Sequence, residues 1–354
     1  MTVISTALLA LLACGARAQA PAAAPAADPY QQAVSQLQSK DAGQRREAAQ
    51  TLGGLRRKDA APALLPLLSD SQPSVRAAAA DALGLLRANQ ATAKLSDLLV
   101  HDKDAGVRQS AATALAYIGD PASADGLIAA LSDPDPAVEY SAARTLGSLH
   151  AAKAVPDLAK AAQSADASLR AVVAGSLGTI GGREGQPALA RLLADSDPSV
   201  RAAAARALGG MGDPSAQSLL DPELRDPQAR VRVEAAFALA KLGKSDGADT
   251  AYAALKDSDP AVRQQAANVV GLVGDAAHGA PALDAAYAAE KDPNTKGCID
   301  FARAQLKARL GLKEAAAAAP AAAPGAGAAK SKTRGSSKTK KKPAAKKTPA
   351  ASAP

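Results

Sequence analysis

One motif recurs along most of this chain at a nearly constant distance. DSDPSVRAAAARALGG begins at Asp195, and close variants begin at Asp70 and Asp257. Each copy contains an apolar anchor followed in most copies by arginine, and the spacings are 32, 31, 31, 31, 31 and 31 residues for the anchors Val75, Val107, Val138, Leu169, Val200, Val231 and Val262. Such a period predicts an array of stacked units, because each unit buries its apolar face only against the next.

Fainter copies extend the array at both ends. Gln44 and Arg45 stand 31 residues before the first clear copy, and Thr295 and Lys296 stand 33 residues after the last. The array therefore contains eight or nine copies and occupies residues 30–312 of the chain.

Each copy predicts two helices joined by a tight turn. Asp197 and Pro198 open the clearer helix, since an aspartate side chain caps free backbone amides and proline fits the first turn. Gly212 ends it, because glycine adopts the left-handed conformation that stops a helix. Asp213 and Pro214 then open the partner helix. The repeated unit is thus a helical hairpin.

The arginine-bearing helix has one apolar face. Val200, Ala204, Ala207 and Leu208 follow the 3.6-residue period of a helix. Aromatic residues make up only 2% of the chain, and small apolar side chains let helices approach closely. We therefore predict an all-α fold, a right-handed α-solenoid of eight to nine helical hairpins of about 31 residues each.

The pattern DPxVRxxAAxALGxxGD at this period resembles the HEAT-like repeat of the phycobilisome lyase type, over about four fifths of the chain. The resemblance implies an armadillo-type superhelix whose arginine-bearing helices line the concave face. For function it implies several possibilities, which are interaction scaffolds, chaperone-like proteins, chromophore lyases and iron hydroxylases.

The segments outside the array have a different composition. Residues 1–18 contain the apolar run TVISTALLALLAC followed by small residues, which is typical of an export signal. The sequence around Cys14 also resembles a bacterial lipobox, so a lipoprotein is an alternative. Residues 19–29 are predicted to be a Pro/Ala linker, and residues 313–354 a disordered Lys/Ala/Pro-rich tail. We expect an exported protein of the periplasm or cell envelope, or a cytoplasmic one if the start codon or the signal interpretation is wrong.

Positive charge is concentrated in the tail. Residues 330–354 hold nine of the 42 Lys and Arg and no acidic residue, which leaves 33 basic against 34 acidic residues elsewhere. Such a tail attracts polyanions regardless of sequence. We expect it to bind an anionic polymer or membrane surface, and nucleic acid only if the chain is not exported. The expected contacts are Lys338, Lys340, Lys341, Lys342, Lys346 and Lys347.

The sequence shows no constellation typical of catalysis or cofactor binding. His101, His150 and His278 are widely separated and none precedes a glutamate, whereas HEAT-like hydroxylases of the deoxyhypusine type hold iron with His-Glu pairs. Cys298 fits a small core residue better than a nucleophile. We predict no catalytic residue, metal or cofactor. An enzyme related to phycobilin lyases or HEAT-repeat iron hydroxylases is the alternative.

The repeated arginine has a functional and a structural interpretation. A guanidinium every 31 residues could bind anions, but its presence in nearly every copy favours ion pairs with acidic groups between repeats. The fourth copy departs from the pattern, because Glu139 replaces the arginine and Tyr140 follows it.

Candidate partner contacts lie where the copies differ. With the anchor as position 0, positions 2, 3 and 6 lie on one side of the helix, away from its packed face. The candidates there are Tyr140, Arg144, Val172, Arg206, Val233, Glu234, Phe237 and Gln264. Aromatic residues and arginine are enriched in interfaces. We predict a monomeric, non-enzymatic scaffold that holds another protein or peptide on its concave face, with the tail as an electrostatic anchor. Polyanion binding by the tail alone is a further alternative.

Overall fold

The structure is a computed structural model, and it describes residues 28–312. Eighteen α-helices follow one another in this range, and no β-strand occurs in it. None of these helices is both long and apolar enough to cross a membrane. The all-α solenoid is thus confirmed. The predicted export signal, nearly all of the linker and the basic tail lie outside the described residues.

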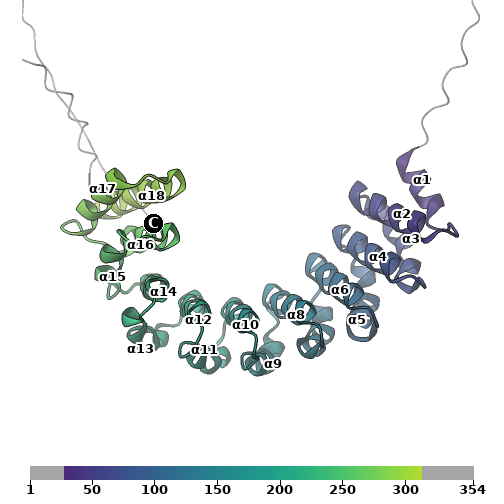
Figure 1. The fold of residues 1–354 in the computed structure, drawn as a ribbon, viewed down its shortest axis with the longest axis horizontal. Helices are drawn as coiled ribbons and strands as arrows, with labels where there is room; N and C mark the ends of the chain where they lie inside the picture. The colour runs from purple at the N-terminus through teal and green to yellow at the C-terminus, as the bar shows by residue number, and fades with distance from the viewer. Residues whose placement is uncertain (1–27, 313–354) are drawn as a thin grey trace, which may run out of the picture. The chain divides into compact units, whose positions relative to one another are not determined.

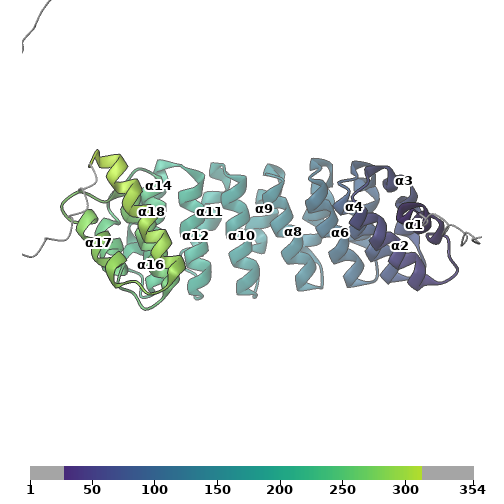
Figure 2. The same cartoon turned by 90° about the horizontal axis from the view of Figure 1, so that it is seen from above.

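The helices form two rows along an arc (Figure 1). The concave row contains α2 (Ala42–Leu55), α4 (Pro73–Leu85), α6 (Ala105–Ile118), α8 (Pro136–Ser148), α10 (Ala167–Ile180), α12 (Pro198–Met211), α14 (Ala229–Lys241), α16 (Pro260–Val273) and α18 (Pro293–Leu310). These are the arginine-bearing helices of the repeats. Figure 2 shows that they run side by side across the arc.

The convex row consists of shorter helices, most of which begin or end in a 3-10 turn. They are α1 (Pro29–Gln36), α3 (Ala61–Leu64), α5 (Thr92–His101), α7 (Ala124–Ala129), α9 (Val155–Ala161), α11 (Gln186–Leu192), α13 (Gln217–Leu220), α15 (Ala248–Ala254) and α17 (Gly279–Ala289). Taken in chain order, each convex helix pairs with the concave helix that follows it. Residues 28–312 therefore contain nine hairpins.

Aspartates start seven of the nine concave helices, as predicted, whereas α4 and α14 begin after Gln72 and Gln228. The side chain of Asp197 accepts a hydrogen bond from the backbone N–H of Ser199 and so caps α12. The same role falls to Asp41, Asp104, Asp135, Asp166, Asp259 and Asp292. Gly119 and Gly212 end α6 and α12 with left-handed φ angles of 73° and 70°. Local sequence signals therefore fix both ends of the repeated helix.

Glycine at position 9 lets consecutive concave helices approach closely. A Cβ on Gly209 would lie 2.4 Å from the Cα of Ala238 on the next concave helix, which is too close for any side chain. Helices α6 and α14 carry Ala116 and Ala240 at this position instead. These two helices pack less extensively against the next concave helix than their neighbours do. The apolar core also divides at α14 into a long N-terminal and a short C-terminal cluster.

Candidate functional site

The repeated arginines form a ladder of ion pairs between hairpins. The Nε and Nη2 atoms of Arg108 donate to the two carboxylate oxygens of Asp133 at 2.7 and 2.8 Å, and Nη1 donates to the backbone carbonyls of Asp102 and Lys103. The two paired side chains are only 10% and 6% exposed. Equivalent two-bond pairs are Arg45–Asp70, Arg76–Asp102, Arg170–Asp195, Arg201–Asp226 and Arg263–Glu290. The structural interpretation of the repeated arginine is therefore confirmed for these pairs.

The ladder controls the ionisation of its carboxylates. Hydrogen bonding from the guanidinium of Arg263, together with the backbone N–H groups of Asp292 and Lys291, lowers the pKa of Glu290 to about 2. Hydrogen bonding from Arg170 likewise lowers the pKa of Asp195. These carboxylates therefore stay charged at any physiological pH.

One rung of the ladder lacks its carboxylate contact. Arg232 donates Nη1 to the carbonyls of Asp226 and Pro227, as its counterparts do. Within residues 28–312, however, no carboxylate forms an ion pair with Arg232, although Asp257 stands at the expected distance in sequence. This open rung lies at the loosely packed junction of α14 and α16, where the apolar core divides.

The fourth copy changes both ends of its rung. Glu139 stands in place of the arginine, and Ser164 in place of the aspartate that would pair with it. The Oγ of Ser164 accepts the backbone N–H of Asp166, just as a ladder aspartate accepts the N–H two residues on. The serine thus keeps the turn and removes the charge. Burial, and repulsion from Asp133 and Asp166, raise the pKa of Glu139.

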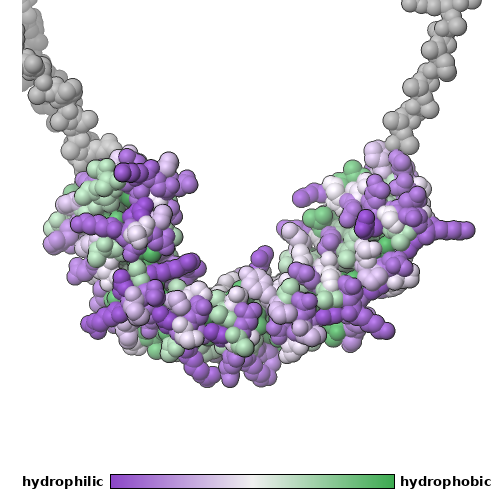
Figure 3. Space-filling model, viewed as in Figure 1, coloured by the Kyte–Doolittle hydropathy of each residue, from purple (hydrophilic) through white to green (hydrophobic). Residues whose placement is uncertain are grey.

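The concave side of α8 and α10 is open. Tyr140 is 38% exposed, and Arg144 is exposed and forms no side-chain hydrogen bond or ion pair with the described residues. Arg144 borders a hollow of about 270 Å³, which is also lined by Gly147, Ser148, Val172, Gly175, Ser176 and Thr179. Figure 3 shows hydrophilic and hydrophobic residues interspersed along the arc. The structure therefore brings three predicted contacts, Tyr140, Arg144 and the half-buried Val172, to one surface.

Tyr117 of α6 lies on the same concave face of the array and was missed from the sequence. It is 51% exposed and occupies position 10 of its copy. Ser148 and Thr179 occupy position 10 of the next two copies and line the hollow, so this position faces the concave side. Continuing the periodicity from positions 2, 3 and 6 to position 10 would have found Tyr117.

The concave side of α12, α14 and α16 is partly closed by its own side chains, although the side chain of Arg206 remains 53% exposed. Arg206 of α12 donates Nε and Nη2 to the two carboxylate oxygens of Glu234 on α14. Gln265 of α16 donates its side-chain amide to the same carboxylate at 3.1 Å. Glu234 is only 6% exposed. Arg206 and Glu234 were both predicted to contact a partner. Arg206 is exposed, so its contact with a partner stays a prediction, whereas Glu234 is buried and its placement on an open surface is wrong.

Three further predicted contacts lie in or near this closed region. Val233 is 1% exposed and packs in the C-terminal apolar cluster, so its predicted place on the open face is wrong. Phe237 is half-buried against the same cluster, with the Nζ of Lys241 5.9 Å from its ring centroid. Gln264 is half-buried and donates its side-chain amide to Thr295 Oγ1 at 2.9 Å. The next repeat covers each of these positions in part.

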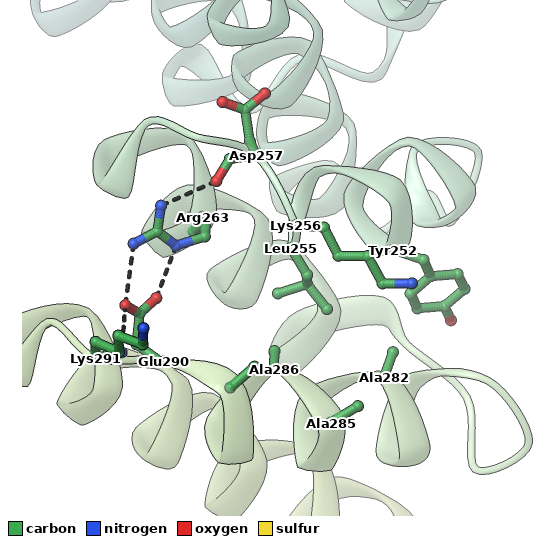
Figure 4. Close-up of a pocket in the computed structure, with 11 residues that line it drawn as sticks. Tyr252, Leu255, Lys256, Asp257, Arg263, Ala282, Ala285, Ala286, Glu290 and Lys291 are labelled. Carbon is green, nitrogen blue, oxygen red and sulfur yellow. Dashed lines mark hydrogen bonds and ion pairs between the residues drawn. The ribbon is translucent and has the colours of Figure 1, made fainter.

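A larger cavity, of about 760 Å³, opens on the convex side (Figure 4). Alanines of α17 line one wall, Leu255 faces them, and the Arg263–Glu290 pair bounds one end. Lys256 and Tyr252 lie at the opposite end. The last copy is two residues longer than the usual 31, and α17 presents only methyl side chains here, so the space between α15 and α17 is left unfilled. Its volume is in the range of small-molecule sites.

The remaining candidates for chemistry are dispersed. His101 ends α5, His150 follows α8 and His278 precedes α17, and Cys298 is half-buried on α18. Within residues 28–312, no three His, Cys, Asp or Glu side chains lie close enough together to hold a metal ion. The enzymatic alternatives stay predictions.

Comparison with known proteins places the repeats in a family. The model of HEAT repeats matches residues 30–116, 92–173, 155–222 and 220–297. A search of curated proteins finds no match. Solved structures that resemble this chain include an engineered protein (22% identity, 79% of this chain and 89% of that one, TM-score 0.46) and the Escherichia coli protein YibA (20%, 78% and 92%, 0.43). Human deoxyhypusine hydroxylase in complex with glycerol is also similar (22%, 69% and 95%, 0.32). The family matches cover most of the array of hairpins, and the chain belongs to the HEAT repeat family.

Proposed function

We propose that this HEAT repeat protein is a non-enzymatic scaffold that binds an extended segment of a partner protein along the concave side of α6, α8 and α10. The observation that carries the proposal is the open surface formed by Tyr117, Tyr140 and Arg144. Within the described residues, these three side chains form no hydrogen bond or ion pair with one another or with their neighbours. Solenoids use such extended concave surfaces for binding.

The chemistry of this surface suits a protein segment. Tyrosine and arginine are the residue types that contribute most binding energy in interfaces, because they bury large areas and still donate hydrogen bonds. Gly175 of α10 lines the hollow, and a Cβ there would meet no atom within 4 Å. Glycine at this position gives a bound backbone room to approach the helix. The hollow is small, which favours single side chains of a partner over a bulky cofactor.

The flanking segments extend the proposal. The nine basic residues of 330–354, with no acidic residue among them, support an electrostatic anchor to an anionic polymer or membrane surface of the cell envelope. The apolar N-terminal run supports export, with lipidation of Cys14 as an alternative. The motif also supports the phycobilisome lyase type of HEAT-like repeat as the subtype of this array.

A cross-linking pull-down from intact cells tests the concave site, with mass spectrometry to map the cross-linked residues. We expect wild type to recover a protein cross-linked to α6, α8 and α10, and the Tyr117→Ala/Tyr140→Ala variant to lose it. Val100→Ala is the matched control, because Val100 is also 38% exposed but lies on the convex helix α5. Equal thermal midpoints for the three proteins show that folding is unaffected.

Two outcomes would contradict the proposal. Recovery of the same cross-links by the double variant would exclude the tyrosine surface as the binding site. A deletion of residues 330–354 that abolishes all capture would transfer binding to the tail, whereas retained capture supports the concave site.

A further inference from the structure

The ladder contains a binding position for a guanidinium that two of the nine copies leave without an arginine: the last copy has Lys296 there, and the fourth has the acidic Glu139. In seven copies, Nη1 of the arginine donates to the backbone carbonyls of the residues six and five positions before it, and these arginines are Arg45, Arg76, Arg108, Arg170, Arg201, Arg232 and Arg263. In the fourth copy, the equivalent carbonyls belong to Asp133 and Pro134. Neither accepts a hydrogen bond from any described residue.

The charge at this position is also uncompensated. Glu139 adds a carboxylate where the other copies place a cation, and Ser164 is neutral. Arg108 is already paired with Asp133, so its positive charge does not compensate the negative charge of Glu139. Burial, and repulsion from Asp133 and Asp166, raise the pKa of Glu139, which agrees with a carboxylate that lacks a counter-charge. We name Glu139, Ser164 and the carbonyls of Asp133 and Pro134 the ladder gap.

The ladder gap adjoins the surface proposed to bind a partner. Glu139 is half-buried, and Tyr140 directly after it is 38% exposed. A partner segment on Tyr140 therefore passes close to Glu139. An aromatic ring stabilises a guanidinium stacked on it, in addition to any ion pair.

We propose that the ladder gap binds an arginine side chain of the partner segment. The inference rests on the proposed function for the existence of a partner, and it specifies one residue type which that partner must present. The arginine would donate to the carboxylate of Glu139 and to the two carbonyls, and so complete the ladder between two chains. Arginine fits better than lysine, because its planar fork donates to a carboxylate and to backbone carbonyls at once.

Titration of the full chain with argininamide tests this assignment. Binding is followed by NMR through the ring signals of Tyr140, which a Tyr140→Phe variant identifies among the five tyrosines. We expect a saturable shift in wild type, with a dissociation constant raised at least fivefold in Glu139→Gln. Glu184→Gln is the control, since it removes one exposed carboxylate elsewhere and should bind as wild type does. Glu139→Arg/Ser164→Asp closes the rung within the chain and should abolish the shift.

Three results would overturn the assignment. Glu139→Gln could bind argininamide as tightly as wild type, or lysinamide could bind as tightly as argininamide. A carbodiimide cross-link from Glu139 to a lysine of residues 330–347, in dilute full chain, would replace the partner by the chain's own tail. These results are separate from those of the pull-down, because a partner could still bind the tyrosine surface without an arginine in the ladder gap.

Discussion

Two groups of concave helices differ in how their polar side chains are used, although they share the same repeat positions. The central group consists of α8 and α10, and the C-terminal group of α12, α14 and α16. In the C-terminal group, Arg206 pairs with a buried glutamate of the next copy, and Arg201 forms a closed ladder rung. In the central group, Arg144 occupies the same position as Arg206 and has no ion-pair partner within residues 28–312, and Glu139 replaces the ladder arginine. At position 6, therefore, the C-terminal group pairs its arginine with the next copy, whereas the central group leaves Arg144 available. The ladder does not divide in the same way, because Arg170 of α10 is paired and Arg232 of α14 is not.

The difference teaches that exposure on a solenoid is decided by the following copy. Position 6 of one copy faces position 3 of the next, where Arg206 meets Glu234. The same register brings Asp81 next to Ser110. Arg144 instead faces the aliphatic Val172, which cannot neutralise it, so its guanidinium stays in solvent. A single exchange at position 3 thus converts a structural arginine into an available one.

The largest expected difference between the two groups is in how much a substitution at the ladder position lowers the free energy of unfolding. Arg201→Ala should lower the free energy of unfolding by about 3 kcal/mol, because it leaves Asp226, which is 6% exposed, without its partner. Glu139→Ala at the same repeat position should change it by less than about 0.5 kcal/mol. Chemical denaturation of both variants measures the difference. Equal losses would mean that the fourth rung is closed by other groups, and the comparison would fail.

A smaller effect separates the two groups at position 6. Arg206→Ala should lower the free energy of unfolding by about 1 to 2 kcal/mol, because Glu234 keeps only the hydrogen bond from Gln265. Arg144→Ala should leave stability within about 0.5 kcal/mol of wild type. Thermal and urea unfolding of the pair measure this. A loss in Arg144→Ala as large as that in Arg206→Ala would contradict an open central surface.

The smallest effect is the pH dependence of the two rungs, which should have opposite signs. The raised pKa of Glu139 means that its charged form is disfavoured in the folded state, so its contribution to stability is lost as pH rises. Glu139→Gln should therefore match wild type near pH 3 and exceed it above about pH 6, by less than about 1 kcal/mol.

Asp226 provides the matched comparison. It is partly buried, yet hydrogen bonding from Arg201 lowers its pKa, so its stabilising contribution is present at neutral pH and is lost as the carboxylate protonates in acid. The stability deficit of Asp226→Asn should thus shrink as pH falls. Unfolding curves between pH 3 and 8 measure both variants, and parallel profiles would contradict the assignment of Glu139 as uncompensated.

Periodicity was enough to predict the solenoid, the aspartate caps and most of the arginine ladder. Each follows from residues that recur in nearly every copy, such as Asp197, Arg201 and Gly212, so comparing the copies with one another reveals the role of each position. The same reasoning located Tyr140 and Arg144, because those side chains depart from the rule on the open face.

The remainder depended on contacts that no single copy contains. The position of Val233 around its helix predicts an exposed side chain, but it packs against the next hairpin and is buried. Glu234 is buried because two neighbouring copies supply its hydrogen-bond donors. The convex cavity lies between α15 and α17, at the one spacing of 33 residues, and its lining depends on how these two helices pack. Such features require the geometry between repeats.

The replacement of glycine by alanine at position 9 of α6 and α14 has a mechanical consequence. Ala116 and Ala240 mark the two loosely packed junctions, and they divide the concave row into three blocks joined at α6/α8 and α14/α16. Where position 9 is glycine, the two concave helices pack at van der Waals contact. Where it is alanine, they pack less extensively, so bending the junction breaks fewer contacts. We expect the arc to bend at these two joints before it bends elsewhere. Because the first joint lies between Tyr117 and Tyr140, flexing there would change the span between the two rings, so the surface could adjust its aperture to what it holds.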